Sequence, residues 1–156
     1  MSNARLILTC GLPGAGKTTL AKKLAAERHA LRLTKDEWLW ALGTSPWDEE
    51  ANDKIEQQLW QLALNALRLG MSVVLDFGLW ARAERNEMRE AARNLGVGVE
   101  LHYLHVPVDE LWRRIDQRNA LPPWRDQPVT RAHLDEWQGT FQAPGAAEQT
   151  LFDLPL

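Results

Sequence analysis

The sequence alternates between short apolar runs and longer segments in which apolar residues recur every three or four positions. The runs predict β-strands over residues 6–10, 31–34, 71–76 and 97–106. The longer segments predict helices over residues 17–30, 38–42, 49–69, 81–95, 107–119 and 130–138. Strands that alternate with helices favour an α/β fold with a parallel sheet. No second domain is indicated, and residues 143–156 lack clear periodicity, so we expect one domain over residues 1–156.

Two of these helices have buried stripes that can be assigned from the spacing. Asp48 is suited to cap the N-terminus of the helix over 49–69, and Gly70 is suited to its C-terminal end. Its expected buried residues are Ile55, Leu59, Leu62, Ala63 and Ala66. Those of the helix over 81–95 are Ala81, Met88, Ala92 and Leu95. A different face of that second helix carries Arg82, Arg85, Arg89 and Arg93, interleaved with glutamates, which predicts a solvated surface.

Composition limits the compartment and the partners. The chain has 156 residues, a formal net charge of −3 and a pI of about 5.8, which gives no general attraction to nucleic acid. Cys10 is the only cysteine, so a reducing cytoplasm is the expected location, and its side chain is expected in the core. No apolar stretch approaches the roughly 20 residues of a membrane span. Residues 1–5 leave no room for a signal peptide before the first strand.

A complete phosphate-binding motif, G-x-x-x-x-G-K-[ST], occupies residues 11–18, between a predicted strand and a predicted helix. Backbone N–H groups of such a loop surround phosphate oxygens, and the helix N-terminus adds partial positive charge. Lys17 is expected to reach the β- and γ-phosphates, and the Thr18 hydroxyl to bind Mg²⁺. The expected nucleotide-binding residues here are Gly11, Pro13, Gly14, Ala15, Gly16, Lys17, Thr18 and Thr19. ATP is preferred over GTP because the guanine-reading N-K-x-D motif is missing from the sequence.

Two aspartates follow predicted strands, at the edge where open α/β sheets bind ligands. Asp76 ends the apolar run 73–75, so we expect it to hold Mg²⁺ opposite Thr18; the alternative is an acid that only begins a turn. Asp36 comes 19 residues after Lys17. It is a candidate base for the proton of an attacking hydroxyl, and the alternative is a helix N-cap.

Arginines are concentrated near a proline-containing loop. The arginines and the loop together predict a lid over roughly residues 113–128. Arg118 and Arg125 are the preferred candidates to contact the transferred phosphate, with Arg114 also expected at the nucleotide. The alternative is that these are exposed arginines of an amphipathic helix. Arg82 and Arg85, near a helix start, are further candidates to touch a phosphate of the acceptor.

These motifs together resemble a group of small P-loop kinases related to the phage polynucleotide 5′-kinase domain, chloramphenicol phosphotransferase and zeta-toxin kinases. The resemblance covers about residues 5–138 and rests on the phosphate loop, the turn 34–36, the strand 73–76 and the segment 110–114. It implies a P-loop NTPase fold with three α/β/α layers, a mainly parallel sheet and a helical lid. It also implies that Asp36 is the general base and that Arg118, or less securely Arg114, is the lid arginine.

Two departures from the polynucleotide kinase concern the acceptor. Leu39 stands three residues after Asp36, where that kinase has an arginine, and an apolar turn begins at Phe77 instead of a polar one. Together with the acidic pI, these changes disfavour a polyanionic acceptor.

The tryptophans suggest what the acceptor site is made of. Trp38, Trp40, Trp80 and Trp124 fall in segments expected to rim that site, whereas Trp60 and Trp112 are expected in the core. An aromatic pocket suits a ring-containing or sugar-like small molecule; the alternative is that all eight tryptophans serve packing.

The leading prediction is therefore an ATP- and Mg²⁺-dependent kinase that phosphorylates a hydroxyl of a small molecule, with neither nucleic acid nor membrane as partner. The alternatives are a kinase of polynucleotide or nucleoside 5′-hydroxyls and a nucleotide-binding switch without kinase activity.

Overall fold

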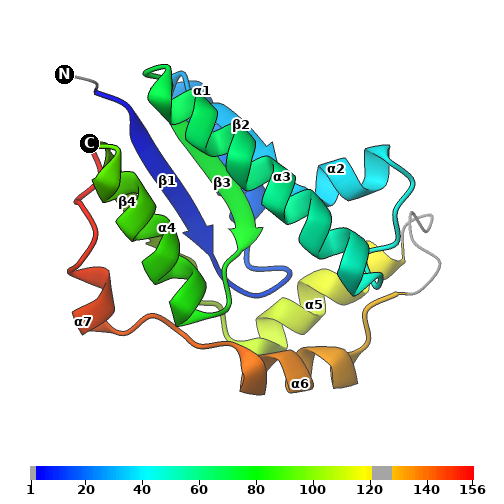
Figure 1. Ribbon diagram of the computed structural model, residues 1–156. Helices are drawn as coiled ribbons and strands as arrows, with labels where there is room; N and C mark the ends of the chain where they lie inside the picture. Colours follow the sequence, from blue (N-terminus) through cyan, green and yellow to red (C-terminus); the bar gives the residue numbers. More distant parts are fainter. Residues whose placement is uncertain (1–2, 121–127) are drawn as a thin grey trace.

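A four-stranded parallel sheet forms the centre of the computed structural model, which describes residues 3–120 and 128–156 (Figure 1). The strands are β1 (Arg5–Cys10), β2 (Leu31–Thr34), β3 (Val73–Gly78) and β4 (Gly98–Tyr103), in the order β2-β3-β1-β4. All neighbouring strands pair in parallel, which confirms the α/β class. β3 runs two residues further than predicted, so that Asp76 lies inside the strand and not at its end.

The helices follow the predicted order, with two differences. They are α1 (Lys17–Arg28), α2 (Lys35–Ala41), α3 (Glu49–Arg68), α4 (Arg82–Asn94), α5 (Val108–Asn119), α6 (Arg131–Thr140) and α7 (Ala146–Gln149). α2 begins three residues before the predicted start at residue 38. α7 lies in the tail, where the sequence pattern predicted no helix. Within the described ranges, no helix combines the length and the apolar character needed to cross a bilayer.

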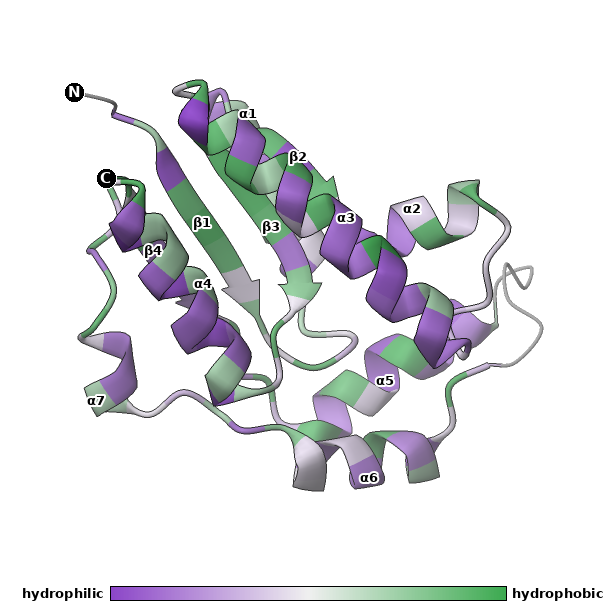
Figure 2. Ribbon diagram, in the orientation of Figure 1, coloured by the Kyte–Doolittle hydropathy of each residue, from purple (hydrophilic) through white to green (hydrophobic). Residues whose placement is uncertain are grey.

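The strands bury both faces, because side chains alternate between the two sides of a sheet. Ile7 and Val74 pack on one side against α1, through Ala21 and Leu24. Leu8 and its alternating neighbours pack on the other side against α3 and α4. Figure 2 shows mainly hydrophobic residues along the strands and a mixture of hydrophobic and hydrophilic residues along the surrounding helices. The three-layer arrangement predicted from the resemblance is thus present.

Two residues on the covering helices differ from prediction. Leu62 of α3 is 39% exposed, because the buried stripe passes through Leu59, Ala63, Ala66 and Leu67 and leaves Leu62 at its solvent side. Arg85 of α4 is fully buried, although the arginine pattern predicted a solvated position.

Arg85 is buried because the C-terminal tail folds back over α4. Its Nε donates to Glu148 Oε2 of α7 over 2.6 Å, and its Nη1 donates to the carbonyl oxygen of Leu79 over 2.8 Å. Further along the tail, Asp153 accepts a hydrogen bond from the backbone N–H of Val99 and pairs with Arg93. Arg85 therefore serves to hold the tail, and the prediction that it contacts an acceptor phosphate is wrong.

α5 and α6 lie below the carboxyl ends of the strands, next to the loop that follows β1 (Figure 1). A separate apolar cluster joins these two helices to the loop through Leu12, Ala15, Leu111, Ile115 and Leu134. The part of the predicted lid that the structure describes is therefore packed against the phosphate-binding motif.

Candidate functional site

The phosphate-binding loop leaves β1 and enters α1 through two glycines in the left-handed region, Gly14 with φ 84° and Gly16 with φ 94°. Any other residue would be strained at either position. A Cβ at Gly14 would also lie 3.2 Å from the carbonyl oxygen of Leu111, so glycine lets α5 pack directly on the loop. Of the predicted loop residues, Pro13, Gly14, Gly16, Lys17, Thr18 and Thr19 line a cavity, whereas Gly11 and Ala15 are buried behind it.

Lys17 is the first residue of α1 and lines this cavity. Its Nζ donates to the carbonyl oxygen of Leu12, 3.0 Å away, which keeps the ammonium group inside the curve of the loop. Burial lowers the pKa of Lys17, while the nearby charges of Asp76 and Asp36 oppose that change. The position of the ammonium between the loop and these carboxylates is suited to binding the phosphates of a nucleotide.

Asp76 accepts hydrogen bonds from three threonine hydroxyls on three elements. Thr18 Oγ1 donates to Asp76 Oδ2 over 2.8 Å, Thr9 Oγ1 donates to Oδ1 over 3.0 Å, and Thr34 Oγ1 donates to Oδ2 over 3.2 Å. Asp76 is buried in β3, beside β1 and β2, so the threonines fix its orientation. A hydroxyl and a carboxylate oxygen in contact at the edge of the phosphate loop are a donor set that fits Mg²⁺.

Asp36 lies in the first turn of α2 and lines the same cavity. The residue at the N-cap position of α2 is Thr34, so the alternative role of Asp36 as the helix cap is wrong. The earlier start of α2 explains the difference, because it moves Asp36 from the turn into the helix. Asp36 and Lys17 line the same cavity, and the charge of Asp36 opposes the lowering of the Lys17 pKa by burial.

Two of the three predicted lid arginines can be placed. Arg114 of α5 donates from Nη1 to the carbonyl oxygen of Gly14 over 3.1 Å, and its Nε donates to Glu110. Arg118, one turn further along α5, lines the cavity, and its charge lowers the pKa of Lys17. Arg114 thus contacts the phosphate loop, and both side chains line the cavity. Arg125 and Trp124 lie outside the described residues.

One cavity of about 780 Å³ connects the phosphate loop with Asp36, Asp76 and both arginines. Of the described tryptophans, Trp47, Trp80 and Trp137 line it. Of these, Trp80 was predicted at the rim; Trp38 and Trp40, also predicted there, are 42% and 56% exposed and are not among the described lining residues. Trp60 and Trp112 pack against apolar clusters as expected. Trp47 lies in the connection 43–48, and Trp137 lies in α6. The sequence pattern did not indicate that the fold brings these two side chains to the cavity.

The cavity also contains carboxyl groups that sequence reasoning missed. Asp53 and Glu56 come from α3, and Glu84 comes from the first turn of α4. Burial raises the pKa of Glu84, and the charge of Glu56 raises it further. Lys35 of α2 donates to Glu56 Oε2 over 3.0 Å. No motif marks these residues. The available signal is their position in the chain, because Glu84 lies in the first turn of the helix after the strand that carries Asp76, and α3 begins at the same edge of the sheet.

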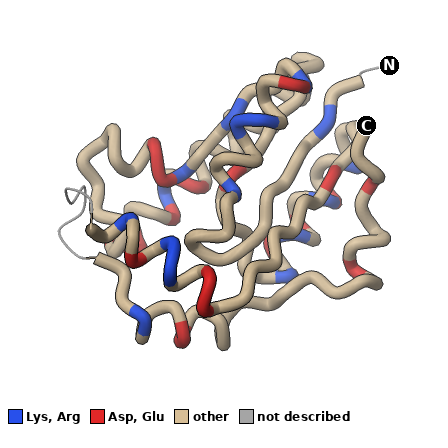
Figure 3. The backbone as a smooth tube through the Cα atoms, turned by 180° about the vertical axis from the view of Figure 1, so that it is seen from behind, with Lys and Arg blue, Asp and Glu red and all other residues tan. Residues whose placement is uncertain are grey.

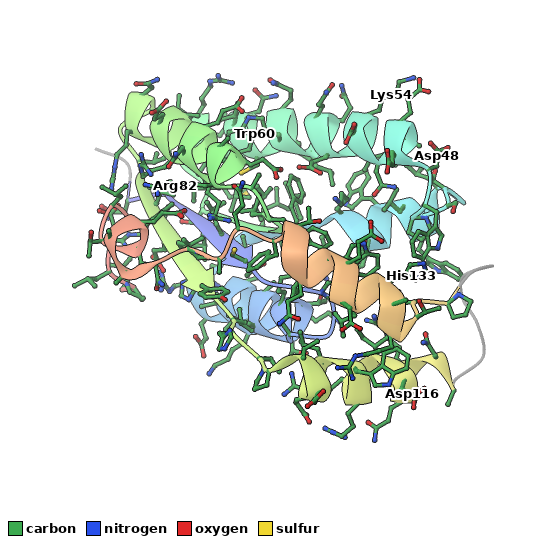
Figure 4. The ribbon with its side chains drawn as sticks, turned by 90° about the horizontal axis from the view of Figure 1, so that it is seen from below. Asp48, Lys54, Trp60, Arg82, Asp116 and His133 are labelled. Atoms are coloured by element: carbon green, nitrogen blue, oxygen red, sulfur yellow. The ribbon has the colours of Figure 1, made fainter. Side chains whose placement is uncertain are left out.

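Charged residues elsewhere are mixed along the helices. Figure 3 shows acidic positions next to basic ones on the tube, without a continuous basic stretch in the part of the chain that is described. Figure 4 looks toward the carboxyl ends of the strands and shows α6, with His133, running between α3, with Lys54, and α5, with Asp116. These helices thus surround the edge of the sheet at which the phosphate loop lies.

A parallel sheet, a phosphate loop and a Thr18–Asp76 pair define the class of P-loop NTPases. The chain belongs to the AAA domain family AAA_33, whose family model matches residues 6–144. The expected membership among the small P-loop kinases is thereby confirmed at the level of the family. A search among curated proteins found no match.

Solved structures of the same fold include three of particular interest. A gluconokinase from Sinorhizobium meliloti is 17% identical, with a TM-score of 0.65 over 94% of this chain and 79% of that one. Kti12 of Chaetomium thermophilum, in complex with ADP-AlF3, is 19% identical, with a TM-score of 0.72 over 91% and 82%. A chain of the Pnkp1/Rnl/Hen1 RNA repair complex is 17% identical, with a TM-score of 0.78 over 98% of this chain and 47% of that one. At these identities the likeness establishes the fold.

Proposed function

We propose that this protein is an ATP-dependent kinase that transfers the γ-phosphate to a hydroxyl group of a small molecule. The observation that carries the proposal is the single cavity that joins the phosphate loop, Asp36 and the tryptophan-lined surface. Such a cavity gives a phosphate donor and an alcohol a common site, with the Asp36 carboxylate among its lining residues. Membership in the family and the likeness to a gluconokinase support a kinase of this kind.

The phosphate end of the cavity would hold the nucleotide. The N-terminal amides of α1 and the Lys17 ammonium group neutralise phosphate oxygens, and Arg114 and Arg118 approach from α5. Thr18 and Asp76 are the residues that would hold Mg²⁺, which draws charge from the β- and γ-phosphates when bound. The structure of Kti12 with ADP-AlF3 supports nucleotide binding by this fold.

Asp36 is the proposed general base. As the acceptor oxygen forms its bond to the γ-phosphorus, the bond from that phosphorus to the bridging oxygen of ADP breaks, and the hydroxyl proton passes to an Asp36 carboxylate oxygen. Asp36 is suited to this role because its carboxylate lines the same cavity as Lys17, where the γ-phosphate would lie. Since Thr34 occupies the cap position, Asp36 does not serve as the N-cap of α2.

A small molecule is preferred over a nucleic acid because of the chemistry at the acceptor end. Asp53, Glu56 and Glu84 are negatively charged in their ionised forms and would repel the phosphates of a polynucleotide. The likeness to a chain of an RNA repair complex makes oligonucleotides a necessary part of any test.

The test is transfer from ATP labelled at the γ-phosphate to a panel of small alcohols and of oligonucleotides with a 5′-hydroxyl. The proposal predicts label on a small molecule and none on the oligonucleotides. Label on oligonucleotides alone would favour a polynucleotide kinase. Slow release of inorganic phosphate, with no label on any acceptor, would favour a nucleotide-binding switch.

A further inference from the structure

The part of the cavity beyond the phosphate loop combines carboxyl groups with aromatic surface, and three helices supply the carboxyl groups. Asp36 comes from α2, Asp53 and Glu56 from α3, and Glu84 from α4. Of the described residues, Lys35 is the one that supplies a cation on this side, and it is paired with Glu56. Lys17, Arg114 and Arg118 also line the cavity, but they belong to the phosphate loop and to the helix packed on it. Among the residues that the structure describes, carboxyl groups thus outnumber cations where the acceptor would bind.

Tryptophans from three separate segments form a continuous aromatic wall in the same cavity. The ring centroids of Trp47 and Trp137 are 5.9 Å apart, and those of Trp137 and Trp80 are 5.7 Å apart. His133 stacks on Trp137 from α6, with centroids 5.6 Å apart, and holds that ring in place. Indole rings attract cations through their faces and also pack against the apolar faces of sugar rings.

From this arrangement we propose that the acceptor is an alcohol that also carries a protonated amine, with an amino sugar as the representative class. The inference rests on the proposed function, since it names the substrate of the same site. The ammonium group would lie among the carboxylates, the ring would pack against the tryptophans, and a hydroxyl would face Asp36. The amine remains unmodified, because the phosphate goes to oxygen.

A second, smaller cavity continues the acidic surface. It has a volume of about 250 Å³ and shares Asp53, Glu56 and Glu84 with the first. It adds Glu87 and Trp60, so carboxyl groups and an aromatic ring occur together there as well. Figure 4 shows Trp60 near α4, away from His133 and Asp116 of the lower helices. The extension favours an acceptor with more than one amine, distributed over more than one ring.

The contacts of Glu84 explain why a cation suits this position. Its side chain accepts from the backbone N–H of Ala81 over 3.3 Å and lines both cavities together with Glu56, whose Oε2 accepts from Lys35 over 3.0 Å. Two carboxyl groups in contact repel each other when both are ionised. An ammonium group of the acceptor would remove that repulsion, whereas an anionic acceptor such as a sugar acid would increase it.

The experiment compares amines with neutral molecules of the same skeleton. The probes are glucosamine against N-acetylglucosamine, and kanamycin against fully N-acetylated kanamycin. Binding is measured by calorimetry without ATP, and transfer is measured separately as kcat/KM. We expect the amines to bind at least about tenfold more tightly than their acetylated partners. Equal or weaker binding of the amines, or no binding by either amine, would overturn the proposal.

Variants then locate the effect. Glu84→Gln should weaken amine binding about tenfold, and Asp53→Asn about threefold because Asp53 is exposed. Glu90→Gln, on the exposed side of α4 and outside both cavities, is the matched control and should leave binding unchanged. Equal effects of Glu84→Gln and Glu90→Gln would contradict the site.

The two proposals fail in different ways. If the amines bind through these carboxylates but no alcohol is phosphorylated, the kinase is wrong and the cation site stands. If neutral alcohols are phosphorylated as well as amines, the kinase stands and the cation site is wrong.

Discussion

Thr18 Oγ1 and Asp76 Oδ2 are 2.8 Å apart, and this hydrogen bond links the phosphate loop to the strand beside it. The two residues are 58 positions apart in the sequence. Parallel pairing of β1 with β3 brings them together, since Thr9 of β1 is in register with Asp76. The contact places a hydroxyl and a carboxylate at the point where Mg²⁺ would join the nucleotide.

Replacing Asp76 with asparagine should weaken Mg²⁺ binding. The asparagine side chain would keep an oxygen acceptor for the threonines but lose the negative charge, so we expect the Mg²⁺ concentration for half-maximal transfer to rise about 10- to 100-fold. The measurement is a Mg²⁺ titration of the transfer rate, and chelation with EDTA should stop the wild-type enzyme. Thr9→Val, which removes the 3.0 Å hydrogen bond to Asp76 Oδ1 but leaves the carboxylate charge in place, is the control. An unchanged Mg²⁺ requirement in Asp76→Asn would contradict the assignment.

Lys17→Ala should abolish measurable transfer, because the lysine neutralises phosphate charge that increases in the transition state. The expected loss is at least about 100-fold in kcat. The transfer assay is read beside the melting temperature, so that a folding defect is recognised. Lys22→Ala, at an exposed position of the same helix, should behave as wild type. Retained transfer in folded Lys17→Ala would disprove the phosphate site.

Glu84→Gln should raise the melting temperature at neutral pH. Burial, together with the charge of Glu56, raises the pKa of Glu84 above its usual 4.5. The folded chain therefore binds this proton more tightly than the unfolded chain does. The contribution of protonated Glu84 to the free energy of unfolding is present below about pH 4.5 and is lost as the pH rises through the raised pKa. Glutamine keeps the uncharged form at every pH.

The measurement is a series of melting curves from about pH 4 to about pH 8, which spans the usual and the raised pKa of a carboxyl group. Glu84→Gln should match the wild type at the acidic end and exceed it at the neutral end. Glu90→Gln should show no such divergence. A stability difference that does not vary with pH would refute the interpretation.

Arg85→Met should destabilise the fold by about 3–5 kcal/mol, because it leaves Glu148 buried and unpaired. The double variant Arg85→Met/Glu148→Met should recover part of that loss, since no charge then remains unpaired. Chemical denaturation measures both. Arg82→Met, at an exposed position of α4, is the control. Additive losses in the double variant would show that the two side chains are not coupled.

The strands and the nucleotide end of the site were predictable because local sequence determines them. The phosphate loop and Asp76 stand directly after apolar runs, Asp36 comes two residues after the strand 31–34, and parallel strands bring such positions to one edge. Cys10 is buried in the core as expected, and burial raises the pKa of its thiol to about 11.

The acceptor end could not be predicted, because its residues meet only through tertiary packing. In the sequence, no motif or periodicity links Trp137 and Glu84 to each other or to the phosphate loop. Arg85 was misassigned for a similar reason, since its partner Glu148 lies in a tail without periodicity.

The central claim concerns Asp36, and the most direct test compares Asp36→Asn with Glu37→Gln, its exposed neighbour on α2, in transfer of labelled phosphate to the acceptor. If Asp36 accepts the hydroxyl proton, kcat of Asp36→Asn should fall about 100- to 10,000-fold while ATP binds with near wild-type affinity. Glu37→Gln should remain active. Transfer by folded Asp36→Asn at the wild-type rate would contradict the account.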